Sequence, residues 1–327
     1  MKADYMNDNK DYVQEFLYGT SDRRFDRGTT MTSIYMDERM EGWIGIPHGG
    51  ISMGIMTDLA LSLNHFPKNN ELLFPLTADF RLGGASLKIG NILHFQVAPD
   101  DGGAKGEANV DGDPIPYMSA SIDYGKDDIQ QRDLFASFIP EHIDEVMTSL
   151  TLLPSYKNCF VCGFERHHPG LKRQFHRWDN RQRIVIAHTG FHSEDSETFY
   201  CFQRSGHLHP LPFLALLDET LGWGGFLISS SGAVTVKISY TFYRPVSVNE
   251  KLVFFGRGDR VKGKADSRLL FWASGGAAAV KKDGRLEMVV SSSGQWFGVQ
   301  DLTEQMKTAL LPKELMDRAF SFAKADY

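Results

Sequence analysis

The chain has 327 residues, of which 42% are hydrophobic and 23% charged, an ordinary balance for a soluble globular protein. This length is enough for two domains of roughly 150 residues each. The net charge of −6 disfavours nucleic-acid binding through bulk charge. Three cysteines are too few for a disulfide framework, and the N-terminus lacks the basic-then-apolar layout of a signal peptide. We therefore expect a cytoplasmic protein that binds neither nucleic acid nor membrane.

The first 126 residues predict one helix that is followed by an antiparallel sheet. A β-branched and aromatic strand at 31–35 leads to the pair Gly49-Gly50, and the apolar run at 51–64 has the length of a buried helix. Three more strand patterns, separated by glycine-rich turns, follow at 76–82, 91–97 and 117–124. A single helix followed by strands at hairpin spacing predicts an α+β fold in which the sheet wraps around the helix.

A second module with the same order of elements is predicted at 158–300. The residues before it, 127–157, are interpreted as a polar linker with a helix that begins at Pro140. In the second module a strand at 183–187 precedes a helix from about Phe213, and strands follow at 234–242, 252–256, 268–273 and 286–291. The tail, 301–327, is predicted to form packing helices that are broken near Pro312.

A constant spacing relates the two modules. His48 and Gly90 are 42 positions apart (90 − 48), and their counterparts His209 and Asn249 are 40 positions apart (249 − 209). An offset near 160 residues therefore holds at both ends of the match, which predicts that the chain contains two copies of one module.

The glycine pair and two acidic residues are the features that point to chemistry. Gly49 and Gly50 lack a Cβ, so their backbone can approach a ligand closely. A helix that begins there offers free N–H groups to an oxygen that carries negative charge. Asp218 and Glu219 lie in an otherwise apolar run, where two acids need a reason to be present. An interface or an exposed helix end is the alternative explanation for these acids.

Several short motifs occur in a set order along the second module. They are Cys159-Phe160-Val161-Cys162-Gly163, Gly170-Leu171-Lys172-Arg173-Gln174-Phe175, Leu216-Leu217-Asp218-Glu219 and Tyr243-Arg244-Pro245. Together with His48-Gly49-Gly50 and Asp58 in the first module, this order resembles the hotdog-fold acyl-CoA thioesterases of the phenylacetate type. The resemblance implies two tandem hotdog modules packed as a pseudo-dimer. It also implies an acyl-CoA substrate, no cofactor, and association of the chain into a homodimer.

Each module departs from the family pattern at one place. The second has His209-Pro210-Leu211 instead of His-Gly-Gly, so one N–H is missing. The first has Thr57 at the family's carboxylate position and Asp58 one place later. The resemblance implies that a site combines the glycine turn of one module with the carboxylate of the other. Gly49 and Gly50 would then face Asp218 or Glu219 in a complete site, whereas Pro210 and Leu211 would face Asp58 in a degraded one.

For the complete site the resemblance implies thioester hydrolysis. The N–H of Gly49 or Gly50 would polarise the carbonyl, and Asp218 would act as nucleophile or as general base for water. Asp218 is preferred over Glu219 because it holds the family's position, nine residues past His209 (218 − 209). His48 is expected to bond to its own loop rather than to act as a base.

Further residues, His209 among them, are candidates for substrate binding. Ser62 and Thr220 follow the acids, and they either hold the nucleophilic water or bond to the backbone. Arg244 and the basic residues of a predicted hairpin are candidates for the phosphates of coenzyme A, with a solvated hairpin as the alternative. The hairpin residues are Arg257, Arg260, Lys262, Lys264 and Arg268.

The sequence predicts no metal site. Cys159 and Cys162 precede His167 and His168, but the spacing is too short for a zinc finger and no second pair completes four ligands. Four scattered histidines of this module could also assemble a metal site, but they are interpreted as loop residues; they are His188, His192, His207 and His209.

Two other functions stay open. A hotdog hydratase or dehydratase would combine Gly206-His207-Leu208-His209-Pro210 with Glu219, although this spacing is shorter than in the dehydratases of acyl-carrier-protein substrates. A non-catalytic acyl-CoA-binding protein would result if both half-sites had decayed.

Overall fold

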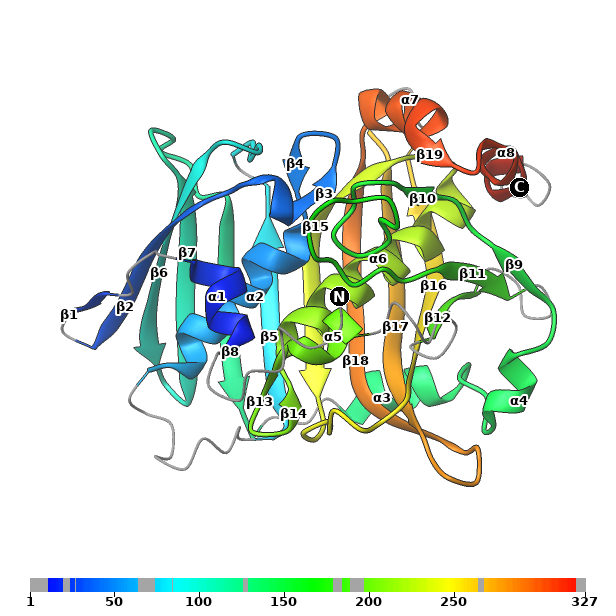
Figure 1. Cartoon of the computed structure of the whole chain (residues 1–327), viewed down its shortest axis with the longest axis horizontal. Coiled ribbons are helices and arrows are strands. Elements are labelled where there is room, and N and C mark those ends of the chain that lie inside the picture. Colours follow the sequence, from blue (N-terminus) through cyan, green and yellow to red (C-terminus); the bar gives the residue numbers. More distant parts are fainter. Residues whose placement is uncertain are drawn as a thin grey trace.

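The structure is a computed structural model of the chain. It describes residues 11–19, 24–26, 28–63, 74–83, 85–125, 129–178, 184–188, 197–263 and 268–321. Thirteen strands form one antiparallel sheet, and two apolar helices, α2 (Gly49–Leu61) and α6 (Pro210–Ser229), lie on the same face of it (Figure 1). The predicted α+β class is confirmed.

The sheet contains the same strand order twice. The first set is β2 (Thr29–Tyr35), β6 (Ile92–Asp100), β7 (Gly103–Val110), β8 (Met118–Tyr124) and β5 (Leu76–Leu82). The second set is β12 (Ile184–His188), β16 (Leu252–Lys262), β17 (Leu270–Val280), β18 (Leu286–Gly298) and β15 (Ala233–Phe242). In each set the strand before the helix lies at one end and the strand after the helix at the other. A helix wrapped by such a sheet is the hotdog fold, which the motifs predicted.

The strands β5 and β15 join the two sets into one sheet. Asp79 on β5 pairs with Ser239 on β15, and these positions differ by 160 (239 − 79). They are therefore equivalent under the offset that the sequence predicts. The Ser239 hydroxyl donates a hydrogen bond to the Asp79 carboxylate at this point. The β5–β15 pair therefore joins the two modules through main-chain pairing as well as through side chains.

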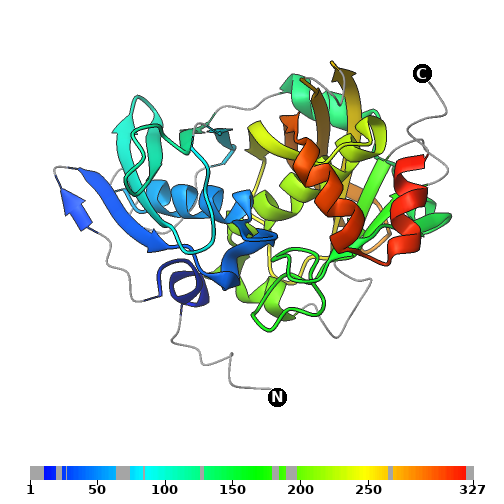
Figure 2. The same cartoon turned by 90° about the horizontal axis from the view of Figure 1, so that it is seen from above.

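The two central helices cross at very short range. A Cβ on Gly50 would lie 2.3 Å from Cα of Ala215, and a Cβ on Gly54 would lie 2.7 Å from Cδ1 of Leu211. The pairs Gly50–Leu211 and Gly54–Ala215 are each 161 positions apart, so the crossing repeats the internal offset (211 − 50; 215 − 54). Figure 2 shows the helices meeting near the middle of the molecule. Glycine on α2 is required by this close approach of the two backbones.

Helix α6 is longer than the sequence predicted. It begins at Pro210 rather than near Phe213, because proline suits the first turn of a helix. It also continues through a glycine-rich stretch, where a Cβ on Gly225 would lie 1.9 Å from the ring of Phe271 on β17. These glycines let the helix press against the sheet. By length and composition α6 could cross a membrane. However, 83% of its most apolar 18-residue stretch is buried inside the protein, as in a core helix.

The predicted linker is more structured than its polar composition suggested. It contains α3 (Ile129–Ala136), α4 (Ile143–Val146), β9 (Leu150–Leu152) and β10 (Ser155–Tyr156). Strand β9 pairs with β11 (Phe175–Trp178) at the edge of the large sheet, opposite the edge formed by β1 (Arg24–Asp26). Strand β10 pairs with β19 (Leu310–Leu311), which lies between the tail helices α7 (Gln300–Ala309) and α8 (Lys313–Ser321).

Short elements complete the described part of the chain. They are α1 (Tyr12–Tyr18), the 3-10 helix η1 (Glu38–Met40), β3 (Glu41–Trp43), β4 (Ile46–Pro47), α5 (Glu197–Cys201), β13 (Gln203–Arg204) and β14 (His207–Leu208).

Gly50→Ala is expected to destabilise the protein by about 3 kcal/mol, because the added methyl group would overlap the backbone of Ala215. Gly49→Ala is the matched control, since its Cβ would lie 3.4 Å from Asp218 and 3.5 Å from Leu82, both ordinary contacts. Urea unfolding of the two variants measures the difference. Equal stabilities would contradict the close helix crossing.

Candidate active site

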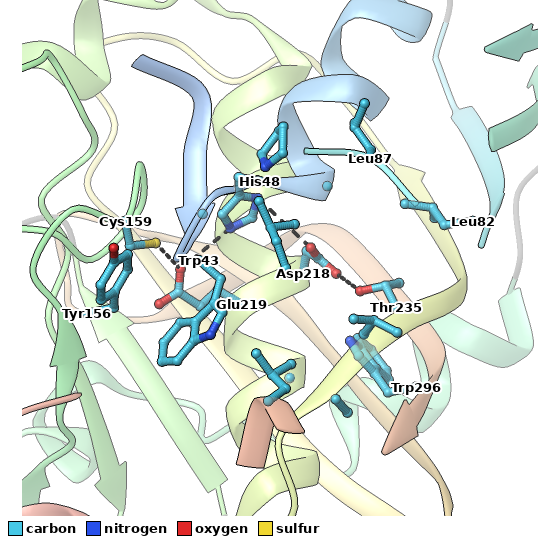
Figure 3. Close-up of a pocket in the computed structure, with 18 of the residues that line it drawn as sticks. Trp43, His48, Leu82, Leu87, Tyr156, Cys159, Asp218, Glu219, Thr235 and Trp296 are labelled. Carbon is cyan, nitrogen blue, oxygen red and sulfur yellow. Dashed lines mark hydrogen bonds and ion pairs between the residues drawn. The ribbon is translucent and has the colours of Figure 1, made fainter. Parts of the chain in front are cut away.

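A cavity of about 390 Å³ lies between the two modules. Its walls come from β3, β4 and the start of α2 on one side, from α6, β15 and β18 on the other, and from α7 of the tail (Figure 3). Most of the wall is apolar and includes Trp43, Leu82, Trp223, Trp296 and Met306. No lysine or arginine occurs among the described lining residues. The polar groups are concentrated where the first turn of α2 meets the middle of α6.

His48 caps helix α2 and determines which backbone donors remain available. The Gly50 N–H donates a hydrogen bond to Nδ1 of His48 over 3.0 Å. The missing Cβ at Gly50 makes room for Ala215 rather than for a ligand, which corrects our expectation for that residue. Gly49 is the first residue of α2, so its N–H belongs to the donors that a helix leaves without an internal acceptor. Gly49 also lines the cavity, and it is therefore the backbone donor that can reach a bound carbonyl.

Asp218 comes from α6 of the second module and lies beside Gly49 of the first. Its Oδ2 is 3.4 Å from the position that a Cβ on Gly49 would take and 4.0 Å from Nδ1 of His48. The hydroxyl of Thr235 on β15 donates to Oδ1 over 2.7 Å. Burial raises the pKa of Asp218, with Glu219 adding to the rise, whereas His48 and Thr235 act in the opposite direction.

Two tyrosines also lie near Asp218. Burial raises the pKa values of Tyr117 and Tyr240, and the charge of Asp218 adds to both shifts. Both phenols therefore remain neutral beside the carboxylate at physiological pH. Of these two, Tyr117 lines the cavity, whereas Tyr240 donates a hydrogen bond to the carbonyl of Leu214 on α6 over 2.9 Å.

Glu219 follows Asp218 on α6 but has different partners. The Cys159 thiol donates to Oε2 of Glu219 over 3.2 Å, and Nε2 of His48 lies 3.5 Å from the same oxygen (Figure 3). Burial raises the pKa of Cys159, so the thiol keeps its proton. Sequence reasoning did not connect Cys159 with this site, although it singled out the Cys159–Gly163 motif. The three residues are distant in the sequence, and only the folded chain brings them together.

The cysteine motif forms a tight loop that is anchored to the first module. The Gly163 N–H donates to the Cys159 carbonyl over 2.9 Å, and a Cβ on Gly163 would lie 2.5 Å from that oxygen. The Val161 N–H donates to Sγ of Cys159 over 3.3 Å. The buried guanidinium of Arg166 donates to the carbonyls of Asn158, His168 and Arg39 over 3.0, 2.9 and 2.6 Å. These contacts fix the position of the Cys159 thiol.

His48, Cys159 and Glu219 are also a possible set of metal ligands, because their ligand atoms lie within 4.8 Å of one another. However, Nδ1 of His48 accepts the Gly50 N–H, which places the ring proton of the neutral imidazole on Nε2. Nε2 is the atom that a metal would have to bind, so the residues present fit a hydrogen-bonded cluster rather than a metal site. His168, which follows the cysteine pair in the sequence, has its Nε2 3.8 Å from Oε2 of Glu38 instead.

In the reverse pairing, His209 of the second module meets Asp58 of the first, and Asp58 lies in a closed salt bridge. His209 caps α6 by accepting the Leu211 N–H over 3.1 Å, and its Nε2 lies 3.2 Å from Oδ1 of Asp58. Asp58 is also paired with Arg204 and accepts a hydrogen bond from Tyr18 over 2.6 Å. Burial acts to raise the pKa of Asp58, but His209, Arg204 and Tyr18 together hold it well below its usual range. Asp58 has no exposed surface and does not line the cavity.

The four predicted substrate-binding residues lie outside the cavity, and His209 contacts Asp58 instead. The Ser62 hydroxyl donates to the Leu59 carbonyl over 2.7 Å, and the Thr220 hydroxyl donates to Leu216 over 2.5 Å. Both are therefore bonded to their own helix, as the alternative explanation stated. Arg244 bonds to Glu250 and Glu287, at 2.7 Å each, instead of presenting its charge to a phosphate. It also lies two residues past the end of β15 (244 − 242), whereas Thr235 is near the start of that strand.

The predicted basic hairpin does not reach the cavity in the part of the chain that the structure describes. Arg257 pairs with Asp259 at 3.1 Å, and the guanidinium of Arg260 lies 4.0 Å above the ring of Trp272. Lys264 and His192 lie outside the described residues. No described residue of this hairpin supplies a cation to the site.

Comparisons with known proteins found likenesses in structure only. No family model and no curated protein matches the chain. A hot dog fold protein of unknown function from Alicyclobacillus acidocaldarius is 12% identical; the match covers 88% of this chain and 97% of that one, with a TM-score of 0.45. A putative thioesterase II from Thermobifida fusca is 12% identical, with coverages of 85% and 96% and a TM-score of 0.48. The tesB protein of Mycobacterium avium subs paratuberculosis is 11% identical, with coverages of 88% and 98% and a TM-score of 0.46. Likenesses this remote carry no argument about substrate or mechanism.

Asp58 and Asp218 are expected to affect stability in opposite directions. Asp58→Asn should cost about 2 kcal/mol at pH 7, because it leaves the partly solvated Arg204 without its counter-charge and weakens the acceptor of the buried His209. The low pKa of Asp58 means that its contribution is present above the ordinary carboxyl pKa and is lost as the pH falls through the folded value.

Asp218→Asn should leave the protein at least as stable as the wild type at pH 7. The raised pKa of Asp218 means that its buried charge costs stability above the ordinary carboxyl pKa, and asparagine removes that cost. Thermal unfolding of both variants at pH 7 compares the two effects. A larger loss in Asp218→Asn than in Asp58→Asn would contradict this assignment.

Proposed function

We propose that the protein hydrolyses an acyl-CoA thioester in the cavity between its two modules. The observation that supports this most strongly is the placement of the Asp218 carboxylate from α6 beside Gly49, the first residue of α2. A backbone donor and a carboxylate side by side at the polar end of a mostly apolar cavity are the two groups that acyl transfer to water requires.

The Gly49 N–H polarises the thioester carbonyl. It lies at the positive end of the α2 dipole, where negative charge that develops on the carbonyl oxygen is stabilised. One such donor contributes roughly 3–4 kcal/mol to the stabilisation of a tetrahedral intermediate. Gly50 takes no part because its N–H already bonds to His48.

Asp218 supplies the second group. Its Oδ1 accepts the Thr235 hydroxyl, while Oδ2 lies on the side of Gly49, where the carbonyl carbon would sit. Asp218 then either attacks the carbonyl carbon or removes a proton from the attacking water. Both routes need the unprotonated carboxylate, so the rate falls as the pH decreases through the raised pKa of this residue.

The apolar wall receives the acyl group. Trp43, Trp223 and Trp296 line the cavity together with Met306 of the tail, whereas the second carboxylate site is closed by its own salt bridge. The chain therefore offers one working site rather than two.

The hydratase alternative has less support. It combined His207 and His209 with Glu219, but His209 contacts Asp58, and Glu219 contacts Cys159 and His48. The His48 ring could pair with Asp218 as a different dyad. Both ring nitrogens already have protein partners, however, so neither is free to move a substrate proton.

Asp218→Asn is expected to reduce thioester hydrolysis by roughly 100- to 10,000-fold, because the base or nucleophile is lost. Thiol release from a panel of short, long and aromatic acyl-CoAs measures the rate, and isothermal titration shows whether the variant still binds. Asp58→Asn, assayed at a temperature where it is folded, serves as the matched control and should keep its activity.

Three outcomes would contradict the proposal. Wild-type protein that binds acyl-CoA without releasing thiol would be a non-catalytic binder. Addition or loss of water at the acyl chain would indicate the hydratase function. An unchanged rate in Asp218→Asn would remove this carboxylate from the mechanism.

A further inference from the structure

Glu219 is held from two sides by groups that the hydrolysis mechanism does not use. The Cys159 thiol comes from the loop that opens the second module, and Nε2 of His48 comes from the first module. Both approach the same oxygen, Oε2, at 3.2 and 3.5 Å. Glu219 also lines the cavity.

The protonation states of the two neighbours follow from their other contacts. Nδ1 of His48 accepts the Gly50 N–H, so the proton of the neutral His48 ring lies on Nε2. Nε2 is directed at Glu219. The buried Cys159 thiol accepts the Val161 N–H at sulfur and donates its own hydrogen to Glu219. Glu219 is thus an acceptor between two donors, an arrangement that resembles the carboxylate that orients a histidine in other enzymes.

A continuous chain of contacts links this cluster to the proposed oxyanion donor. It runs from the Cys159 thiol to Glu219, then to His48, and from Nδ1 of His48 to the Gly50 N–H. The Gly49 N–H precedes Gly50 by one residue, so the tilt of the His48 ring determines how the first turn of α2 faces the cavity. The cysteine loop itself bonds to the first module through the Phe160 N–H, which donates to the Glu41 carbonyl over 2.7 Å.

We propose that Cys159 and Glu219 are positioning residues that lock the orientation of His48 and so keep the Gly49 N–H opposite Asp218. This inference rests on the proposed thioesterase function for its kinetic consequence. Its structural consequence, the fixed first turn of α2, holds without any assumption about the reaction. The Cys159-x-x-Cys162-Gly163 motif then has a role as the rigid support of a hydrogen-bond donor.

The first test is independent of activity. Hydrogen exchange, followed on peptides that cover 48–52, is measured for wild type, Cys159→Ala, Cys159→Ser and Cys201→Ser. We expect exchange at the start of α2 to become about tenfold faster in Cys159→Ala, because one hydrogen bond to the carboxylate is lost. Serine at 159 restores a donor and should return exchange to near the wild-type rate. Cys201 lies on α5 outside the cavity, so Cys201→Ser should match the wild type.

The second test is kinetic and uses an acyl-CoA that the wild type hydrolyses. Cys159→Ala should lower kcat about tenfold with KM within about twofold, and Cys159→Ser should recover most of the loss. Glu219→Gln removes a charge that helps to raise the pKa of Asp218, so the acid limb of its kcat profile should move to lower pH. A residue that only fills space would not shift this limb.

The results separate failure of the inference from failure of the proposed function. Wild-type exchange in Cys159→Ala, or no recovery in Cys159→Ser, would overturn the positioning role whatever the activity of the protein. Stoichiometric zinc that copurifies with the wild type and is lost in Cys159→Ala would also overturn it, by assigning the three residues to metal binding. Absence of thiol release, with the exchange pattern as expected, would instead reject only the thioesterase proposal.

Discussion

The close crossing of α2 and α6 is the constraint on which the rest of the structure depends. Gly50 and Ala215 bring the two helix backbones together without a side chain between them. Gly49 precedes Gly50 on α2, and Asp218 lies about one turn beyond Ala215 on α6. The crossing therefore places the N-terminus of α2 against a carboxylate. Neither module contains both groups in the right place. The proposed site therefore exists only because the two modules pack at this distance.

The two carboxylates Asp58 and Asp218 have opposite electrostatic environments. On one side, Arg204, His209 and Tyr18 surround Asp58, hold its pKa low and remove it from the cavity. On the other side, no lysine or arginine lines the cavity beside Asp218 in the described part of the chain, and burial raises the pKa of Asp218. The first carboxylate contributes to stability, whereas the second is kept in an unfavourable environment. That contrast is typical of one structural site and one functional site.

Much of the fold and part of the site could be predicted from the residues themselves. The internal offset, the glycine turn and the acids in an apolar run are local patterns, and they predicted the repeated helix-and-sheet module. The sequence could not show that the Gly50 N–H is taken by His48, or that Arg244 is neutralised by Glu250 and Glu287. Those facts depend on side-chain direction and on partners that are distant along the chain.

A crystal structure of Asp218→Asn with a bound acyl-CoA would show directly whether Gly49 and position 218 form the site. We expect the thioester carbonyl oxygen to lie within hydrogen-bonding distance of the Gly49 N–H. The carbonyl carbon should lie next to the substituted side chain at position 218, with the acyl group among Trp43, Trp223 and Trp296. An acyl-CoA bound beside Asp58 and His209, or one whose carbonyl points away from α2, would contradict this expectation.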